Sequence, residues 1–173
     1  MKRINEDIKN NSFKPCYLLF GSERYLVTSY RTRLKNALVP EDDTMNFNSF
    51  NGKGLDTDEV ISLGVTLPFF ADRRVIMIDG SGMFKGSSET NTKFAEWIKN
   101  IPETTVVIFS EEDVDKRSAM YKAVAEKGLA VEMNGPKEDE LLTFIGARLK
   151  KNDLQITGND ASYLLSSVGS DMM

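Results

Sequence analysis

One segment of the chain has the layout of a phosphate-binding site, in which a short apolar strand passes through a tight turn into a helix. In residues 17–26 the strand is 17–20, Gly21 permits the turn, and Ser22 is a residue type that caps helices. A phosphate-binding loop needs the pattern G-x-x-x-x-G-K-[ST], whose backbone N–H groups, lysine and hydroxyl hold phosphates and Mg²⁺. Here a single glycine is followed by the acidic Glu23, where the phosphates would lie. The segment predicts the frame of a nucleotide site without its chemistry.

Acidic residues also follow two other apolar segments. Asp79 follows residues 75–78, and residues 110–113 (Ser-Glu-Glu-Asp) follow residues 106–109. Ligands of parallel α/β sheets gather at the carboxyl ends of strands, which makes these acids candidate Mg²⁺ ligands. The alternative is that they are solvated strand ends, and the missing phosphate loop favours that alternative.

The composition excludes several classes of chemistry. The 173 residues include no histidine, which removes the commonest general base and the commonest transition-metal ligand. Cys16 is the only cysteine, so the chain can form neither an internal disulfide nor a cysteine metal site, as expected of a protein of the reducing cytoplasm. The net charge of −4 gives no general basic surface for nucleic acid, although a local patch remains possible. No apolar run approaches the roughly 20 residues of a membrane span.

Strand and helix patterns alternate along the first 133 residues, which predicts a parallel α/β sheet flanked by helices. The predicted strands are residues 17–20, 45–50, 75–78, 106–109 and 130–133. The predicted helices are residues 23–38, 57–66, 92–100 and 116–127, the last with Gly128 as its C-cap. Phe94, Trp97 and Ile98 share one helical face and are predicted to be core residues. Residues 80–88 are predicted to form a flexible surface loop.

The pattern changes at Asn134-Gly135-Pro136, which predicts a domain boundary. Beyond it, two helical segments at residues 138–151 and 160–168 each carry one apolar face. Two helices bury little surface alone, so we expect residues 135–173 to be the start of a truncated helical domain.

The residues before the third predicted strand form a candidate protein-binding site. Pro68 ends the preceding helix, and Phe69 and Phe70 follow in a short connector beside Leu67. Neighbouring side chains diverge in a regular backbone, so both rings are unsuited to entering the same core. The residues alone leave two alternatives open, either display of the rings to a partner or burial between helix and sheet.

Two charged clusters are also ambiguous. The cluster Asp115-Lys116-Arg117 is predicted to open a helix, and could contact a phosphate or another subunit or form a solvated first turn. The pair Arg73-Arg74, before a predicted strand, has the same ambiguity.

Two segments and their order resemble the delta subunit of the bacterial DNA polymerase III clamp loader. They are residues 17–26 (YLLFGSERYL) and 66–75 (TLPFFADRRV), and the cluster 115–117 and the ending 168–171 are also similar to that family. The resemblance spans nearly the whole chain and about the first half of a full-length member. It implies a degenerate AAA+ fold: residues 1–134 would be a RecA-like domain without a functional phosphate loop. Residues 135–173 would begin a helical lid, and the collar domain would be absent.

The resemblance also implies a function. The family serves DNA replication as part of the DNA polymerase III holoenzyme, and binds and opens the sliding clamp (the beta subunit) without binding ATP or having a catalytic site. Its apolar clamp-binding pair maps onto Phe69 and Phe70, with Leu67 and Pro68 adjacent. The implied partners are the clamp, the other loader subunits (gamma/tau and delta prime), and DNA only in the assembled complex. No cofactor and no membrane are implied.

Two other functions compete with this expectation. An active P-loop NTPase is disfavoured because the chain has no G-K-[ST] sequence. A small-molecule α/β enzyme is disfavoured because histidine is absent and no strand end carries a nucleophile elbow.

Overall fold

The chain divides into two compact units, Met1–Met133 and Asn134–Met173. The computed structural model describes residues 1–40, 43–52, 54–135, 138–150, 152 and 154–168. No helix among these residues is both long enough and apolar enough to span a membrane. The first unit is an α/β/α sandwich, and the second is a pair of helices.

A five-stranded parallel sheet in the order β2-β3-β4-β1-β5 forms the centre of the first unit as described. The strands are β1 (Cys16–Phe20), β2 (Phe47–Asn51), β3 (Arg74–Asp79), β4 (Thr105–Glu111) and β5 (Leu129–Glu132). Every residue of β1 and β4 is buried, as expected for apolar central strands that are covered on both faces. The predicted parallel α/β sheet is confirmed, with strand limits shifted by one or two residues.

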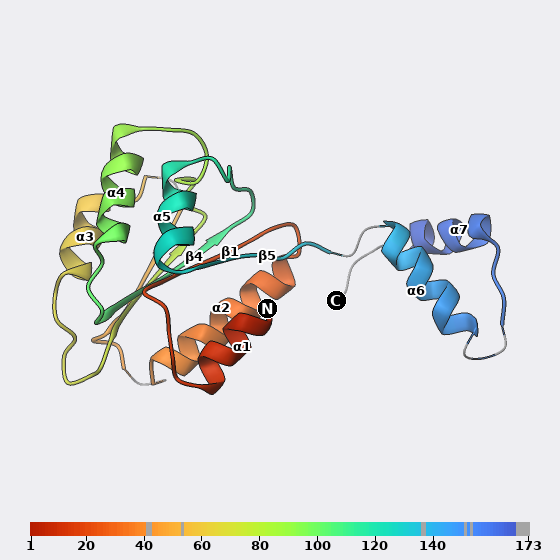
Figure 1. Ribbon diagram of the computed structural model, residues 1–173, viewed down its shortest axis with the longest axis horizontal. Helices are drawn as coiled ribbons and strands as arrows, with labels where there is room; N and C mark the ends of the chain where they lie inside the picture. The colour runs from red at the N-terminus through yellow and green to blue at the C-terminus, as the bar shows by residue number, and fades with distance from the viewer. Residues whose placement is uncertain (41–42, 53, 136–137, 151, 153, 169–173) are drawn as a thin grey trace. The chain divides into compact units, whose positions relative to one another are not determined.

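Helices cover both faces of this sheet. Figure 1 shows α1 (Lys2–Lys9) and α2 (Arg24–Leu38) on one face, and α3 (Thr57–Gly64), α4 (Glu89–Lys99) and α5 (Ala119–Lys127) on the other. Successive side chains of a strand point to opposite faces. Tyr17 and Leu19 therefore join the core beneath α1 and α2, whereas Leu18 and Phe20 join the core beneath the other three helices.

The helix ends differ from the predicted ones where short polar residues cap them. Ser88 and Ser118 are the N-caps of α4 and α5, and each hydroxyl accepts a backbone N–H bond from inside the first turn. The N-cap of α2 is Glu23 and not Ser22, and the Glu23 side chain makes no capping hydrogen bond with the described residues. Gly128 ends α5, as predicted.

Helix α1 was not predicted from the sequence, and its Ile4 is fully buried against the sheet. The predicted surface loop at residues 80–88 is confirmed only in part: the segment contains no helix or strand and residues 85–88 are exposed, but Phe84 is fully buried, and its ring meets that of Phe109 edge-on with centroids 5.2 Å apart. The predicted core residues Phe94 and Ile98 are confirmed as fully buried, and Trp97 packs against the same core.

Cys16 begins β1 and is fully buried, with its thiol 3.9 Å from the carbonyl oxygen of Val124. Burial raises the pKa of this thiol to about 12, because the thiolate would lose its hydration in the core. Gly128 lies against the same residue, and a Cβ at that position would come within 1.9 Å of the Cys16 carbonyl oxygen. The close approach therefore requires glycine after α5.

The second unit contains α6 (Glu138–Lys150) and α7 (Gly158–Val168), which contact each other. The start of α7 is fixed by Thr157 and Asp160, since the Thr157 hydroxyl donates to the Asp160 carboxylate at 2.7 Å and accepts its backbone N–H at 3.2 Å. Both predicted helices are confirmed, except that the predicted end at Lys151 lies outside the described residues.

Candidate functional site

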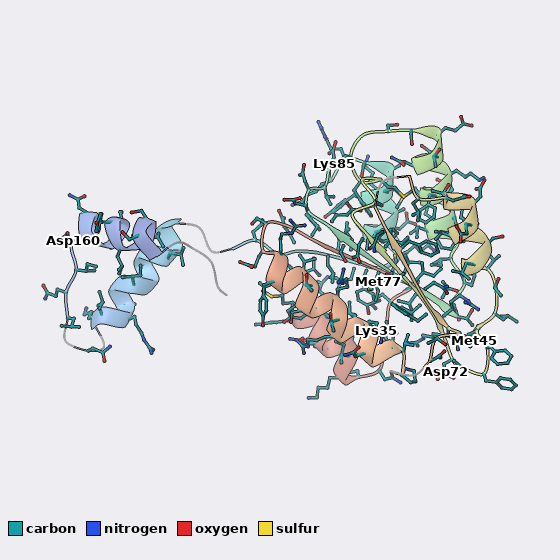
Figure 2. The ribbon with its side chains drawn as sticks, turned by 180° about the vertical axis from the view of Figure 1, so that it is seen from behind. Lys35, Met45, Asp72, Met77, Lys85 and Asp160 are labelled. Carbon is teal, nitrogen blue, oxygen red and sulfur yellow. The ribbon has the colours of Figure 1, made fainter. Side chains whose placement is uncertain are left out.

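The two edges of the sheet carry different kinds of side chain. At the carboxyl edge, the turns after β1, β3 and β4 and the first turns of α2 surround a hollow of about 430 Å³ that is lined largely by charged residues. At the amino edge, the residues before β2 and the loop between α3 and β3 expose apolar side chains. Figure 2 shows Lys85, which lines the hollow, at one end of the first unit, and Met45 and Asp72 together at the other.

Backbone groups in the turn after β1 are already bonded within the protein. Gly21 has φ +132° and donates its N–H to the carbonyl of Glu111 at 3.3 Å. The N–H of Glu23 donates to the carbonyl of Met133 at 3.0 Å. A phosphate-binding loop directs such N–H groups at its ligand, whereas the N–H groups of Gly21 and Glu23 in this turn are bonded to backbone carbonyls.

Asp79, which ends β3, is paired with a cation of the same chain. Its Oδ2 lies 2.5 Å from Nη1 of Arg31, which extends from the middle of α2. The Asp79 and Arg31 side chains are only 21% and 26% exposed, and Asp79 Oδ1 and Arg31 Nε have no hydrogen-bond partner among the residues that the structure describes. The carboxylate that could have been a Mg²⁺ ligand instead joins α2 to β3.

Glu111, at the end of β4, holds the loop that follows β3. Its Oε1 accepts the N–H and the hydroxyl of Ser81 at 2.9 and 2.6 Å, and its Oε2 accepts the N–H of Gly82 at 3.3 Å. Burial raises the pKa of this carboxyl, although these bonds favour its charged form and oppose the shift. The alternative of a solvated strand end is therefore wrong for Glu111, which is 6% exposed.

The charges around the hollow are mixed. Three cations and four acids line it: Arg24, Arg31, Lys85, Asp79, Glu111, Glu112 and Asp113. Arg31 is paired with Asp79, and Lys85 lies 3.2 Å from Asp113. A triphosphate entering this hollow would meet more carboxylates than cations, which opposes its binding.

The loop between α3 and β3 exposes three of the four candidate residues strongly. The exposed fractions of Leu67, Phe69 and Phe70 are 75%, 56% and 95%, and Pro68 is half-buried. The two rings meet edge-on with centroids 4.5 Å apart. Of the two alternatives for the pair, burial in the core is excluded.

The backbone of Phe70 is unusual, because its φ of +50° lies in the left-handed region. Bulky residues with a Cβ rarely adopt this conformation, which costs roughly 1–2 kcal/mol. A strained backbone persists only where the surrounding structure fixes it. The residues that hold this loop are therefore part of the site.

Two buried polar residues that the sequence analysis missed hold the loop. The Asn46 side-chain amide bonds both the N–H and the carbonyl of Phe69, and the Arg74 guanidinium donates to the carbonyls of Thr66 and Leu67. The sequence pattern places Asn46 inside a predicted strand and leaves the role of Arg74 ambiguous. The only sequence signal was the presence of polar residues beside the start of each strand.

Asp43 hydrogen-bonds Asn46, one of the two residues that hold the loop. Its carboxylate accepts the Asn46 side-chain and backbone N–H groups at 2.8 and 2.9 Å. These bonds, with smaller contributions from the N–H of Met45 and the charge of Arg74, hold the pKa of the Asp43 carboxyl below its ordinary value.

The remaining charged cluster forms local pairs. Arg117 bonds Asp115 two residues away at 3.0 Å, and Lys116 bonds Glu132 at 2.6 Å. The cluster precedes α5 instead of opening it, since the helix begins at Ala119. These exposed pairs do not converge on a cavity with the candidate loop residues.

Solved structures share the architecture of this chain. A DNA clamp loader delta protein of Bacillus subtilis matches with a TM-score of 0.72 at 21% identity, over 95% of this chain and 51% of that chain. A DNA polymerase III gamma subunit-related protein of Thermotoga maritima matches with a TM-score of 0.57 at 14% identity, over 95% and 57% of the two chains. A RuvB variant from the same organism matches with a TM-score of 0.51 at 14% identity, over 91% and 50%. The predicted AAA+-like α/β fold is therefore confirmed.

Sequence comparison identifies the family. DNA polymerase III subunit delta of Bacillus subtilis strain 168 is 25% identical over 167 residues, which are 91% of this chain and 48% of that protein. The chain thus spans about half the length of the delta-subunit relatives that it matches. The family model described as DNA polymerase III, delta subunit, matches residues 17–134, the greater part of the chain. The chain therefore belongs to the delta-subunit family of the DNA polymerase III clamp loader.

Proposed function

We propose that this chain binds the sliding clamp through Leu67, Pro68, Phe69 and Phe70 and opens the ring without binding ATP. The observation that carries the proposal is the display of Phe69 and Phe70 on a loop with a strained backbone. Exposed aromatic side chains are the commonest anchors of protein interfaces, because each can bury a large apolar area in a partner pocket. The name of a similar solved structure, a DNA clamp loader delta protein, supports the choice of a sliding clamp as the partner.

Opening of the ring needs no hydrolysis by this chain. If the loop binds more tightly to a clamp whose subunit interface is distorted, binding shifts the clamp toward that open state. The differential affinity offsets the contacts that the clamp loses at its interface. The rings of Phe69 and Phe70 would supply most of that affinity.

The absence of ATP binding is supported by the carboxyl edge of the sheet. Bound phosphates would need donors at Gly21 and Glu23, whose N–H groups are bonded to backbone carbonyls. Bound Mg²⁺ would compete with Arg31 for Asp79. An active P-loop NTPase is thus disfavoured by the structure as well as by the sequence.

The remaining expectations form part of the same proposal. Residues 1–134 act as the RecA-like AAA+ domain, and residues 135–173 begin the helical lid. The gamma/tau and delta prime subunits are the partners in the loader, where DNA is met only in the assembled complex, and the chain works in the cytoplasm without a cofactor. The relatives' additional length is the natural place for further assembly contacts.

The test is to measure clamp affinity and melting temperature for the double variant Phe69→Ala/Phe70→Ala. The matched control is Tyr25→Ala, which removes an exposed aromatic ring, 58% exposed, from α2. We expect the double variant to melt like the wild type and to lose measurable clamp binding, while the control binds normally. Wild-type affinity in the double variant would refute the site.

A further inference from the structure

Asn46 is a buried residue whose side chain serves the candidate loop. It is 2% exposed and precedes β2. Its Oδ1 accepts the N–H of Phe69 at 2.6 Å, and its Nδ2 donates to the carbonyl of the same residue at 2.9 Å. One side-chain amide therefore fixes the peptide groups on both sides of Phe69.

Asn46 is itself anchored on two sides. Its Nδ2 also donates to Asp43 at 2.8 Å, and its backbone carbonyl accepts the N–H of Val75 at 2.8 Å. Val75 belongs to β3, so the anchor connects the loop to the sheet. The amide can rotate away from Phe69 only by giving up several bonds at once.

Arg74 holds the preceding part of the loop. It is 6% exposed, and its Nε and Nη2 donate to the carbonyls of Thr66 and Leu67 at 3.3 and 3.4 Å. Its Nη1 donates to the carbonyl of Met45 at 3.3 Å. A buried guanidinium is unfavourable unless its donors are satisfied, and here the three loop carbonyls and the Asn48 side-chain oxygen in β2 accept hydrogen bonds from it.

These hydrogen bonds hold the residues that precede Phe70, whose backbone is strained. Thr66, Leu67 and Phe69 are each held through their main chain, and Phe70 follows immediately with φ +50° and an almost fully exposed ring. The ring contributes nothing to the core. The hydrogen bonds from Asn46 and Arg74 therefore stabilise a loop conformation that exposes the rings of Phe69 and Phe70.

We infer that Asn46 and Arg74 are positioning residues, which hold the loop of residues 67–70 in its clamp-binding conformation before the clamp arrives. The inference rests on the proposed function, because it takes the clamp as the partner. A loop that is already ordered loses less conformational entropy on binding, so affinity depends on residues that never touch the clamp.

The first experiment replaces Asn46 in the whole 173-residue chain and measures affinity for a purified bacterial sliding clamp. We expect Asn46→Ala to weaken binding roughly tenfold or more, through lost ordering of the loop. The Phe69 N–H should exchange with solvent faster than in the wild type. Asn51→Ala, at the exposed far end of β2, is the matched control and should change neither quantity.

A second variant separates positioning from structural support. In Asp43→Asn/Asn46→Asp, positions 43 and 46 can still hydrogen-bond with donor and acceptor reversed, but a carboxylate cannot donate to the Phe69 carbonyl. We expect melting close to that of Asn46→Ala or better, with clamp affinity still reduced. Wild-type affinity in this exchange variant would overturn the inference, and the variant decides the matter should Asn46→Ala fail to fold.

Arg74→Lys provides the equivalent test on the other side of the loop. Lysine keeps the charge but cannot reproduce the fork of donors that reaches two loop carbonyls. We expect weaker clamp binding than in Arg73→Lys, whose native arginine stacks over the Phe13 ring with its Cζ 5.3 Å from the centroid. Equal binding in the two lysine variants would count against the inference.

The outcomes distinguish failure of the positioning role from failure of the proposed clamp binding. If Phe69→Ala/Phe70→Ala binds the clamp normally, the proposed function is wrong. If that double variant loses binding while the Asn46 and Arg74 variants bind like the wild type, only the positioning role is wrong.

Discussion

At the carboxyl edge of the sheet charged side chains pair with one another, whereas at the amino edge polar side chains bond the backbone and leave apolar rings outside. Arg31 and Asp79 exemplify the first arrangement, and Asn46 and Phe69 the second. Both edges contain buried polar groups. The two arrangements leave different groups available, since the first pairs Arg31 with Asp79 and the second leaves the rings of Phe69 and Phe70 exposed.

Under the proposed function, an AAA+-like fold would serve binding without nucleotide chemistry. In doubly wound sheets the carboxyl edge is the usual ligand site. Here the described candidate contacts lie at the opposite edge, in the loop before β3. Changes at one edge should therefore leave the other largely unaffected, which the following variants test.

The largest expected effect is on clamp affinity at the amino edge. Each of Phe69→Ala and Phe70→Ala should weaken binding roughly 30- to 1,000-fold, since an aromatic anchor contributes about 2–4 kcal/mol. Melting temperatures should stay near that of the wild type, because neither ring is buried. A large drop in melting temperature would show that the rings support the fold.

A smaller effect, on stability, is expected at the carboxyl edge. Arg31→Ala leaves Asp79 without its cation in a mostly covered position, which should lower the free energy of unfolding by about 1–3 kcal/mol. Clamp affinity should not change. Arg33→Ala, on the exposed side of the same helix, is the control for chemical denaturation. Reduced clamp binding in Arg31→Ala would show that the edges are coupled.

A still smaller change in stability is expected for Phe70→Gly. Glycine adopts φ +50° without strain, and this gain is offset by the roughly 0.5–1 kcal/mol that glycine loses in chain entropy. Unfolding should stay within about 1 kcal/mol of the wild type while clamp binding falls as in Phe70→Ala. A glycine variant much less stable than the alanine variant would contradict the strained conformation.

The smallest expected effect is the change in melting temperature on addition of nucleotide. About 1 mM Mg-ATP should leave the melting temperature unchanged, whereas a dissociation constant of about 10 μM would add about 2.7 kcal/mol of stability. The same titration on Arg31→Ala tests whether the paired cation alone excludes the nucleotide. A higher melting temperature of the wild type in Mg-ATP would contradict the prediction that the carboxyl edge binds no nucleotide.

The fold was predictable because the central strands are buried on both faces. Such strands are runs of consecutive apolar residues, as in β1 and β4, and they stand out from the amphipathic helices between them. The first helix was missed because it is short and mostly polar, with Ile4 and Ile8 as its only apolar residues. Phe84 was missed because the glycines around it indicate a loop without showing which side chains the loop buries.

The candidate site was predictable only in part. The pattern before β3 marked Phe69 and Phe70, but their exposure depends on the backbone of Phe70 and on contacts made from far along the chain. Asn46 is 23 residues from Phe69, and Met45 is 29 residues from Arg74. Local patterns do not record such contacts, so the support of the loop was accessible only from the fold.

The burial of Cys16 has a practical consequence for measurements on this chain. Thiolates attack thiol-reactive dyes, and a fully buried thiol with its pKa raised to about 12 offers almost no thiolate at neutral pH. The native chain is thus nearly silent toward maleimide labelling. A cysteine introduced as Asp72→Cys, in the exposed stretch after the two rings, would accept a fluorophore selectively and report clamp docking in real time.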